Sequence, residues 1–279
     1  MKSAPLRLIV EVRWGPMQGR KACCSPGQRI TIGRAATNDL AVPNDEEMAE
    51  LQFELHWDGR VCALAHRGGD VETLLGGEAC LSGDVAHGQW LRAAGTDFSV
   101  YFEEQIPAKA VRTDAELARS EAAAAVLDGD PGPLFALVDA ARDDRLLELL
   151  RQSVEEYRSL YDGVEGETLA EAAPYLVAIP SGSRLRAALL REGWGRRWFS
   201  ALRSHKPLLE LRRHLRKFLM VQLEGDEDPV YFRFYDPEVL RVYMRSCGPE
   251  DRRPWFDGVI EAFFVEDASD GARCLRIDP

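Results

Sequence analysis

Two aspartates each follow a strand-like run of residues, a position at which carboxylates can carry out acid–base or metal chemistry. Asp139 follows the apolar run 134–138, and Asp236 follows the alternating run 230–235. Active-site carboxylates of open α/β sheets often lie at strand ends, and a pair of them could act as general acid and base. Both also stand directly before a predicted helix, where a carboxylate accepts unpaired backbone N–H groups. Both roles remain open, and we expect the capping role.

No other residue pattern in the chain indicates catalysis. None of the five histidines lies in a nucleophile or metal motif, and the phosphate-binding and dinucleotide-binding glycine motifs are absent. The six cysteines include no C-x-x-C pair, so we expect reduced, mostly buried thiols rather than disulfides or a metal site. We therefore predict no catalytic residue, no metal, no cofactor and no enzymatic activity.

Positive charge is concentrated in one stretch of an acidic chain. The 279 residues carry a net charge of −11, which argues against a dedicated nucleic-acid-binding protein. A helix predicted from Pro207 carries basic side chains opposite its leucine stripe, so we expect them to face solvent. These residues are Arg212, Arg213, Arg216 and Lys217. A solvated helix face and a surface for an acidic protein partner both fit this pattern.

The junction around Asp236 has the clearest local signals for a strand followed by a helix. Polar and apolar residues alternate over 230–235, which is the period of a strand. Asp236 then occupies the N-cap, and Pro237 follows at the first helical position, where its missing N–H costs nothing. We expect Arg233 to form an ion pair with Asp236 or Asp139, and so to fix this part of the domain.

The region from 133 to 279 alternates between strand-like and helix-like stretches. Continuous apolar runs at 134–138 and 175–179 are typical of strands covered on both faces. A helix is expected to carry Leu146, Leu150, Val154 and Tyr157 on one side. Further strands are predicted at 219–223, 258–265 and 274–277, a turn at 225–229, and helices after Ser183 and Pro207. This pattern predicts an α/β domain with helical cover, with strand directions left open.

The region from 1 to 105 reads as short strands with no helical periodicity, which predicts an all-β sandwich. Asp58-Gly59 is expected to form a type I′ turn between two strands.

Ile106-Pro107 should end the sandwich. Residues 106–132 are expected to form a linker with one short helix starting at Thr113, where the spacing resembles a capping box without its glutamate. The predicted fold class is therefore α+β and multidomain.

The N-terminal region resembles the forkhead-associated (FHA) family. The resemblance rests on Ile32-Gly-Arg34, Asn38-Asp-Leu40, Leu81-Ser-Gly-Asp84 and Gly88-Gln-Trp-Leu91. In that family an arginine, a serine and an asparagine on neighbouring loops bind phosphothreonine, and a histidine props the loops. Arg34 matches the arginine, whereas Ala49 and Gln52 stand at the serine and histidine positions.

These departures change what we expect the FHA-like domain to bind. A dianionic phosphate needs several convergent donors, whereas acidic residues, Asp45 among them, lie near Arg34 in sequence. We therefore expect a domain that docks its partner without phosphorylation, with Arg34 and Asn38 as partner-binding residues. A phosphothreonine-dependent signalling module is the alternative.

The C-terminal region resembles the effector-adaptor (Tap/Tec chaperone) family of bacterial type VI secretion over residues 133–267. The motifs are Leu137-Val-Asp-Ala-Ala141, Pro174-Tyr-Leu-Val177, His214-Leu-Arg216 and Phe232-Arg-Phe-Tyr-Asp-Pro237. Members of that family are not enzymes, and they hold a toxic effector and help mount it on the VgrG spike. The structural residues of the last motif are Arg233, Tyr235, Asp236 and Pro237. As a member of the His-Leu-Arg motif, Arg216 could instead pair internally.

The two resemblances together imply a cytoplasmic, non-enzymatic adaptor whose partners are a type VI effector and VgrG. We expect no nucleic-acid partner and no membrane insertion, because no apolar run approaches ~20 residues. Trp198 is a candidate anchor at the partner interface, since interface hot spots favour tryptophan and arginine. A hydrolase that uses Asp139 and Asp236 is the rival from another class.

Overall fold

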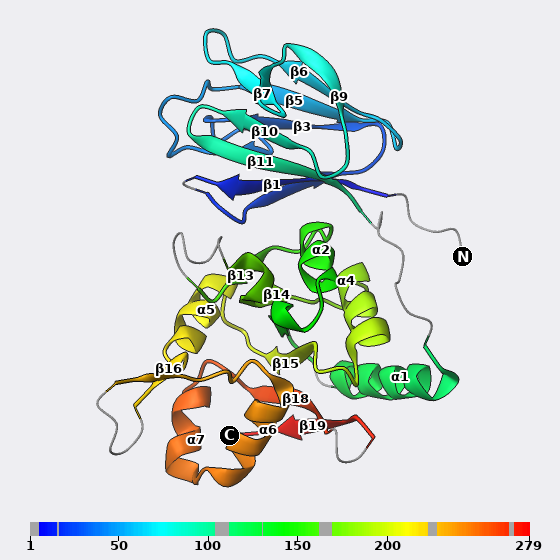
Figure 1. Ribbon diagram of the computed structural model, residues 1–279, viewed down its shortest axis with the longest axis vertical. Helices are drawn as coiled ribbons and strands as arrows, with labels where there is room; N and C mark the ends of the chain where they lie inside the picture. The colour runs from blue at the N-terminus through cyan, green and yellow to red at the C-terminus, as the bar shows by residue number, and fades with distance from the viewer. Residues whose placement is uncertain are drawn as a thin grey trace. The chain divides into compact units, whose positions relative to one another are not determined.

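The computed structural model describes residues 6–15, 17–103, 112–129, 131–161, 169–222, 228–267 and 271–279 (Figure 1). The chain divides into two compact units. One comprises Met1–Pro107 with Arg151–Glu156, and the other comprises Ala108–Leu150 with Tyr157–Pro279. Each unit has its own hydrophobic core. The expected end of the sandwich at Ile106-Pro107, and residues 223 and 225–227 of the strand and turn predicted after α5, lie outside the described residues.

The N-terminal unit is a β-sandwich of two sheets, as the sequence predicts. One sheet has the strand order β2-β1-β11-β10-β7-β8 and the other has the order β4-β3-β5-β6-β9. Neighbouring strands are antiparallel except for the β3–β4 pair. The strands are β1 (Leu8–Trp14), β2 (Lys21–Cys24), β3 (Gln28–Gly33), β4 (Leu40–Ala41), β5 (Phe53–Trp57), β6 (Cys62–His66), β7 (Thr73–Leu75), β8 (Glu78–Ala79), β9 (Ser82–Val85), β10 (Trp90–Ala93) and β11 (Thr96–Phe102).

Side chains from both sheets fill the space between them. In β5 the buried residues alternate with the less buried Glu54 and the exposed His56, the period-2 pattern of a half-covered strand. Phe53 of one sheet meets Phe98 of the other edge to face, with ring centroids 5.5 Å apart.

The turn between β5 and β6 differs from the predicted type I′ turn. Four residues join the strands, and within the pair Asp58-Gly59 only Gly59 has a positive φ, of 103°. The Asp58 carboxylate instead accepts hydrogen bonds from the backbone N–H groups of Arg60 and Val61, both at 2.7 Å. A side chain that mimics a backbone turn therefore replaces the second left-handed residue.

A helix occurs where the linker helix was predicted, α1 (Asp114–Asp128), with a complete capping box, but it belongs to the C-terminal unit and contributes Ala123 and Leu127 to its core. The Thr113 hydroxyl accepts from the Glu116 N–H, and the Glu116 carboxylate accepts from the Thr113 N–H at 2.8 Å. The expectation of a missing glutamate was wrong because the third helical residue is Glu116, not Leu117.

The C-terminal unit is built on one antiparallel sheet with the order β13-β14-β12-β15-β18-β19. Its strands are β12 (Leu134–Asp139), β13 (Tyr157–Ser159), β14 (Pro174–Ala178), β15 (Phe199–Arg203), β18 (Ala262–Asp267) and β19 (Arg273–Ile277). Two further strands, β16 (Met220–Val221) and β17 (Val230–Tyr231), form a separate small hairpin. The helices and helical turns are α2 (Arg145–Arg151), α4 (Arg184–Ala188), α5 (Leu208–Arg216), α6 (Pro237–Ser246), α7 (Pro249–Phe256), η1 (Ala140–Arg142), η2 (Ala170–Ala172) and η3 (Leu189–Gly193).

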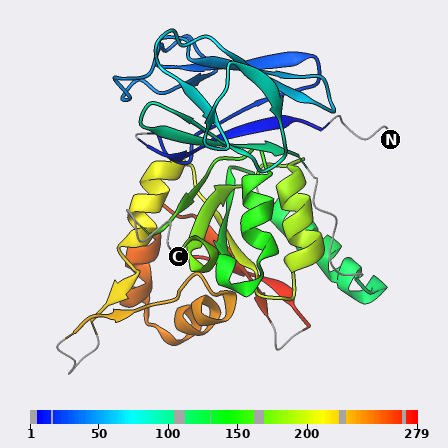
Figure 2. The same ribbon diagram turned by 45° about the horizontal axis from the view of Figure 1, so that its top comes forward.

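Both faces of this sheet are covered, as the apolar run 134–138 predicts. Every residue of β12 is buried, and its side chains alternate between two cores. One core receives residues from α1, α2 and α4, and the other receives residues from α5, α6 and α7 (Figure 2). The mixed α+β architecture predicted from the sequence is therefore confirmed.

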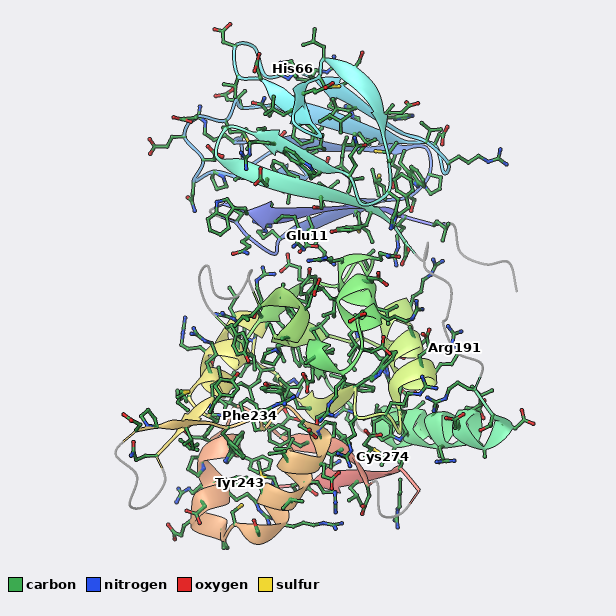
Figure 3. All side chains as sticks on the ribbon, viewed as in Figure 1. Glu11, His66, Arg191, Phe234, Tyr243 and Cys274 are labelled. Carbon is green, nitrogen blue, oxygen red and sulfur yellow. The ribbon has the colours of Figure 1, made fainter. Side chains whose placement is uncertain are left out.

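Two local predictions for this unit were wrong, and one strand was not predicted. The helix expected to reach Tyr157 ends at Arg151, and Tyr157 lies in strand β13. Strand β15 was not predicted. The strand expected over 230–235 is limited to β17, because the chain curls back on itself: the Phe234 N–H donates to the Phe232 carbonyl at 2.9 Å. This curl allows Phe234, labelled in Figure 3, to be fully buried.

No helix among the described residues is both long enough and apolar enough to cross a membrane.

Replacing Leu137 of β12 with alanine should strongly destabilise the C-terminal unit. Leu137 is fully buried in the core on one face of the sheet, so the expected loss is about 2–5 kcal/mol of unfolding free energy. Leu209→Ala is the matched control, because Leu209 is 59% exposed and should change stability by less than about 0.5 kcal/mol. Urea denaturation of the full chain measures both, and equal midpoints for the two variants would contradict the burial of this face of β12.

Candidate functional site

A cluster of four charged side chains joins strand β12 to the segment before helix α6. The Asp139 side chain is fully buried, and its Oδ2 lies 2.9 Å from a guanidinium nitrogen of Arg233 and 3.3 Å from Nε of Arg142. Arg142 also pairs with Asp236. Two ion-pair partners were expected for Arg233, and the structure shows Asp139 as the partner. The second arginine of the cluster, Arg142, was missed by the sequence analysis.

The two aspartates also cap the helical turns that they precede. Asp139 Oδ1 accepts from the Ala141 N–H at 3.3 Å, and Asp236 Oδ1 accepts from the Glu238 N–H at 2.9 Å. Each of the four carboxylate oxygens is therefore engaged by an arginine or a backbone N–H. The geometry supports the capping role of this pair.

Aromatic rings cover the cluster on its hairpin side. Tyr235 is buried, and the Arg233 guanidinium lies 5.7 Å from the centroid of its ring, within the range of a cation–π contact. Tyr231, which is 41% exposed, packs between the rings of Tyr161 and Tyr235, at centroid distances of 5.8 and 6.4 Å. Burial raises the pKa of both the Tyr231 and the Tyr235 hydroxyl, so both stay protonated at neutral pH.

The basic residues of α5 do not all face solvent as predicted. Arg212 donates from Nε to the Ser159 carbonyl at 2.6 Å and from a terminal nitrogen to the Tyr161 carbonyl at 3.0 Å. Arg213 and Lys217 are exposed, whereas Arg216 is half-buried. The positive surface of this helix is therefore smaller than its sequence suggests, since Arg212 ties α5 to the end of β13.

Trp198, the predicted interface anchor, and His214 of the His-Leu-Arg motif are both buried inside this unit. Trp198 is only 3% exposed and packs against Gly193, where an added Cβ would lie 2.7 Å from its ring. The indole is therefore part of the core, and the structure does not present it as a surface anchor. His214 of the His-Leu-Arg motif is also buried, and its Nε2 lies 2.8 Å from the Trp255 carbonyl on α7.

The sandwich retains only some of the residue types that bind phosphothreonine in the FHA family. Arg34 is exposed and donates from Nε to the Met48 carbonyl at 3.2 Å. Asn38 donates to the Ala35 and Glu50 carbonyls, at 2.8 and 2.7 Å, so its amide fixes the loop. Asp45 does not face Arg34 as the sequence suggests, because it is buried and accepts from the Thr96 hydroxyl.

Gln52 takes over the propping role that the resemblance assigns to a histidine, which the sequence analysis did not foresee. Its Oε1 accepts from the Ala49 N–H at 3.1 Å, while its Nε2 donates to the Val71 carbonyl at 2.8 Å and to the Thr73 hydroxyl. His66 reaches the same hydroxyl through Nδ1 at 3.0 Å. The loops are thus fixed by a neutral amide, and Ala49 brings no hydroxyl for a phosphate.

No group of three or more histidine, cysteine, aspartate or glutamate side chains within the described ranges is arranged to hold a metal ion.

Comparison with protein families identifies one matching region in the chain. Residues 134–254 match the family described as "Domain of unknown function (DUF4123)". This is the region that carries the four effector-adaptor motifs, so the resemblance of the C-terminal unit is confirmed at the level of the family. No curated protein sequence matches the chain.

Several solved structures are similar to about a third of the chain. The FHA domain of an Arabidopsis thaliana hypothetical protein is 21% identical with a TM-score of 0.34, covering 38% of this chain and 92% of that chain. An FHA domain studied for phosphothreonine-dependent interactions is 21% identical with a TM-score of 0.31, covering 34% and 95%. The cytoplasmic domain of the type III secretion sorting platform protein PscD from P. aeruginosa is 18% identical with a TM-score of 0.30, covering 38% and 92%.

Asp139→Asn should destabilise the C-terminal unit by about 2–3 kcal/mol. Breaking a fully buried pair costs about 3–5 kcal/mol, and the loss here is smaller because the Arg142 and Arg233 side chains are 30% and 50% exposed. Asp278→Asn, at an exposed ion pair with Arg276, is the control and should change little. Urea denaturation distinguishes the two variants. An unfolding free energy of Asp139→Asn equal to that of the wild type would show that the cluster does not stabilise the unit.

Stability should fall on acidification because of His214. Burial lowers the pKa of His214 below its ordinary value of about 6.5. Its contribution is therefore complete above about pH 6.5 and is lost as the pH falls through the folded-state pKa, where the unfolded chain binds the extra proton. His214→Gln should flatten the dependence of the melting temperature on pH between about 7 and 5. Parallel curves for wild type and His214→Gln would contradict this.

Proposed function

We propose that this chain is a non-enzymatic adaptor that binds a type VI secretion effector in the cytoplasm and helps load it onto the VgrG spike. The observation that carries the proposal is the spatial convergence of motifs within the matched family region 134–254. Asp139 of the first motif pairs with Arg233 of the last, and it lies opposite Pro174 of the second in the β12–β14 register. His214 of the third motif contacts the backbone of α7.

The charge arrangement of these motifs favours binding over chemistry. Their carboxylates are paired with arginines and backbone N–H groups, which supports a stabilising role for these side chains. A sheet covered on both faces then gives the helices around it a rigid base. Those helices are the surfaces on which we expect effector and spike to dock.

We propose that the sandwich adds a second docking surface that works without phosphorylation. Arg34 is the one cation retained from the phosphothreonine-binding set, and one of its donors is already directed at the Met48 carbonyl. Ala49 lacks the hydroxyl, and Glu46, Glu47 and Glu50 are exposed on the same stretch of chain. Such a surface is poorly matched to a dianion, which needs several converging donors.

The adaptor proposal predicts a stable complex on co-expression. Full-length chain, candidate effector and candidate VgrG are produced together, captured through a tag on this chain, and separated by size-exclusion chromatography. We expect co-elution, or an effector that is soluble only when this chain is present. A chain that elutes alone with every candidate would contradict the proposal, and a hydrolytic activity lost in Asp236→Asn with the fold intact would support the rival hydrolase.

The docking proposal for the sandwich predicts that Arg34→Ala changes effector capture to the same extent whether or not the effector is phosphorylated. Phosphothreonine peptides titrated into the full chain should bind no more tightly than their unphosphorylated forms, because the convergent donors are missing. Arg60→Ala, at an exposed turn of the same unit, is the control substitution. Micromolar binding that requires both the phosphate and Arg34 would overturn phosphorylation-independent docking in favour of a signalling module.

A further inference from the structure

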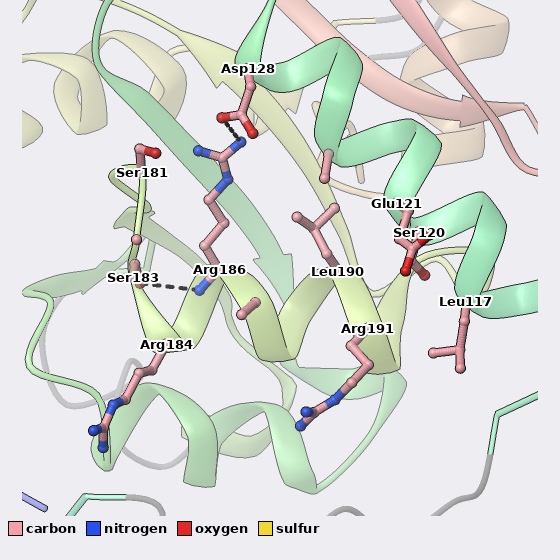
Figure 4. Close-up of a pocket in the computed structure, with 13 residues that line it drawn as sticks. Leu117, Ser120, Glu121, Asp128, Ser181, Ser183, Arg184, Arg186, Leu190 and Arg191 are labelled. Atoms are coloured by element: carbon pink, nitrogen blue, oxygen red, sulfur yellow. Dashed lines mark hydrogen bonds and ion pairs between the residues drawn. The ribbon is translucent and has the colours of Figure 1, made fainter. Parts of the chain in front are cut away.

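A groove runs between α1 and the continuous helical segment α4–η3 of the C-terminal unit (Figure 4). Its volume is about 490 Å³, within the range of ligand-binding clefts. A second hollow of about 520 Å³ adjoins it and shares Asp128, Ser181 and Arg186. All the residues that line both hollows belong to one compact unit, so the groove is a feature of that unit alone.

Each wall of the groove is formed mainly by one side of a helix. The lining residues recur at about one helical turn along α1 and along α4–η3, with neighbouring residues at some of the turns. Those of α1 are Leu117, Ser120, Glu121, Ala124 and Asp128, and those of α4–η3 are Arg184, Arg186, Ala187, Leu190 and Arg191, with Ser181, Gly182 and Ser183 from the turn before α4. Ala124 and Ala187 lie at the middle of the two walls, where small side chains let a further helix approach closely.

Polar contacts join the two helices at both ends of the groove. The Arg112 guanidinium, just before α1, donates to the Glu192 and Trp194 carbonyls at 2.8 Å each. At the other end of α1, Asp128 pairs with Arg186 at 2.7 Å (Figure 4). These contacts fix the spacing of the two helices in the unoccupied chain, so the groove is preformed, which lowers the entropic cost of filling it.

Opposite charges line the two rims. Glu121 belongs to the α1 side, whereas Arg184 and Arg191 belong to the α4–η3 side, and the Arg191 side chain is 60% exposed and also pairs with Glu192 at 3.3 Å. An occupant with one basic and one acidic edge would meet both rims favourably, in one orientation only.

The helical backbone of the walls limits which kind of peptide can bind in the groove. Both walls are helical, and helix interiors present no unpaired backbone N–H or C=O groups for an added strand. A peptide that enters an apolar groove must therefore satisfy its own backbone groups, which a helix does.

We infer that the groove binds a short amphipathic helix of the effector. Apolar side chains one turn apart would insert toward Ala124 and Ala187, a basic side chain would lie at the Glu121 rim, and an acidic one at the Arg184 and Arg191 rim. The inference rests on the proposed adaptor function and specifies the surface and partner segment that the function would use.

Site-specific photo-crosslinking in the full chain tests the inference. The photoreactive residue p-benzoylphenylalanine replaces Ala124, Ala187 or, as a control on α1 outside the groove lining, Val126. The probe is the effector that co-purifies with the wild-type chain. We expect cross-links from positions 124 and 187, but not 126, to one effector segment with apolar residues at i, i+3 or i+4, and i+7. Cross-links to VgrG, to a second copy of this chain or to an extended segment would overturn the inference.

Two substitutions test the same surface by affinity. Ala187→Trp fills the groove, and Glu121→Lys reverses one rim, so each should weaken effector binding by about tenfold or more. Val126→Trp should bind as wild type does, and the Glu121→Lys result stands even if Ala187→Trp perturbs the fold. Wild-type binding retained in both groove variants would overturn the inference while leaving the adaptor function intact. A wild-type chain that binds no effector would overturn both.

Discussion

The C-terminal unit depends on the buried carboxylate of Asp139. It lies at the end of the central strand β12, fully shielded from solvent, where an unpaired charge would be costly. Arg142 and Arg233 meet it from two sides, and Arg233 is 94 residues away in the sequence. Arg142 extends the network to Asp236, the cap of α6. The curl at 232–236 and the start of α6 are thus held against β12 by the same charges.

Where a structural feature depends on neighbouring residues, the sequence predicted it well. The covered strand β12, the caps at Ser183 and Asp236, and the helix α1 all follow from short patterns. Features that depend on distant partners were missed. Strand β15 is buried although it ends in Arg203. The Arg203 guanidinium donates to the Leu127 carbonyl at 2.7 Å, and this distant partner cannot be identified from the residues of the strand.

In the candidate site, too, the sequence predicted local features better than contacts between distant residues. The Arg233–Asp139 pair was one of two options, whereas Arg142 was overlooked, although its place three residues after a strand-end aspartate was an available signal. Arg212 was expected in solvent because it lies opposite a leucine stripe, yet a long side chain can reach over its own helix to carbonyl groups beyond. In the sandwich, Gln52 keeps the loop architecture with a neutral amide, so the fold persists although part of the phosphate-binding set is replaced.

Amide hydrogen exchange of the full chain, alone and in complex with its effector, would test the central claim most directly, namely that the motifs are a scaffold and the surrounding helices are the docking surface. We predict that α1 and α4 gain protection in the complex, whereas β12 and residues 232–237 exchange slowly in both states. Protection gained at β12 and 232–237, with α1 and α4 unchanged, would contradict the claim and place the functional surface at the Asp139 cluster itself.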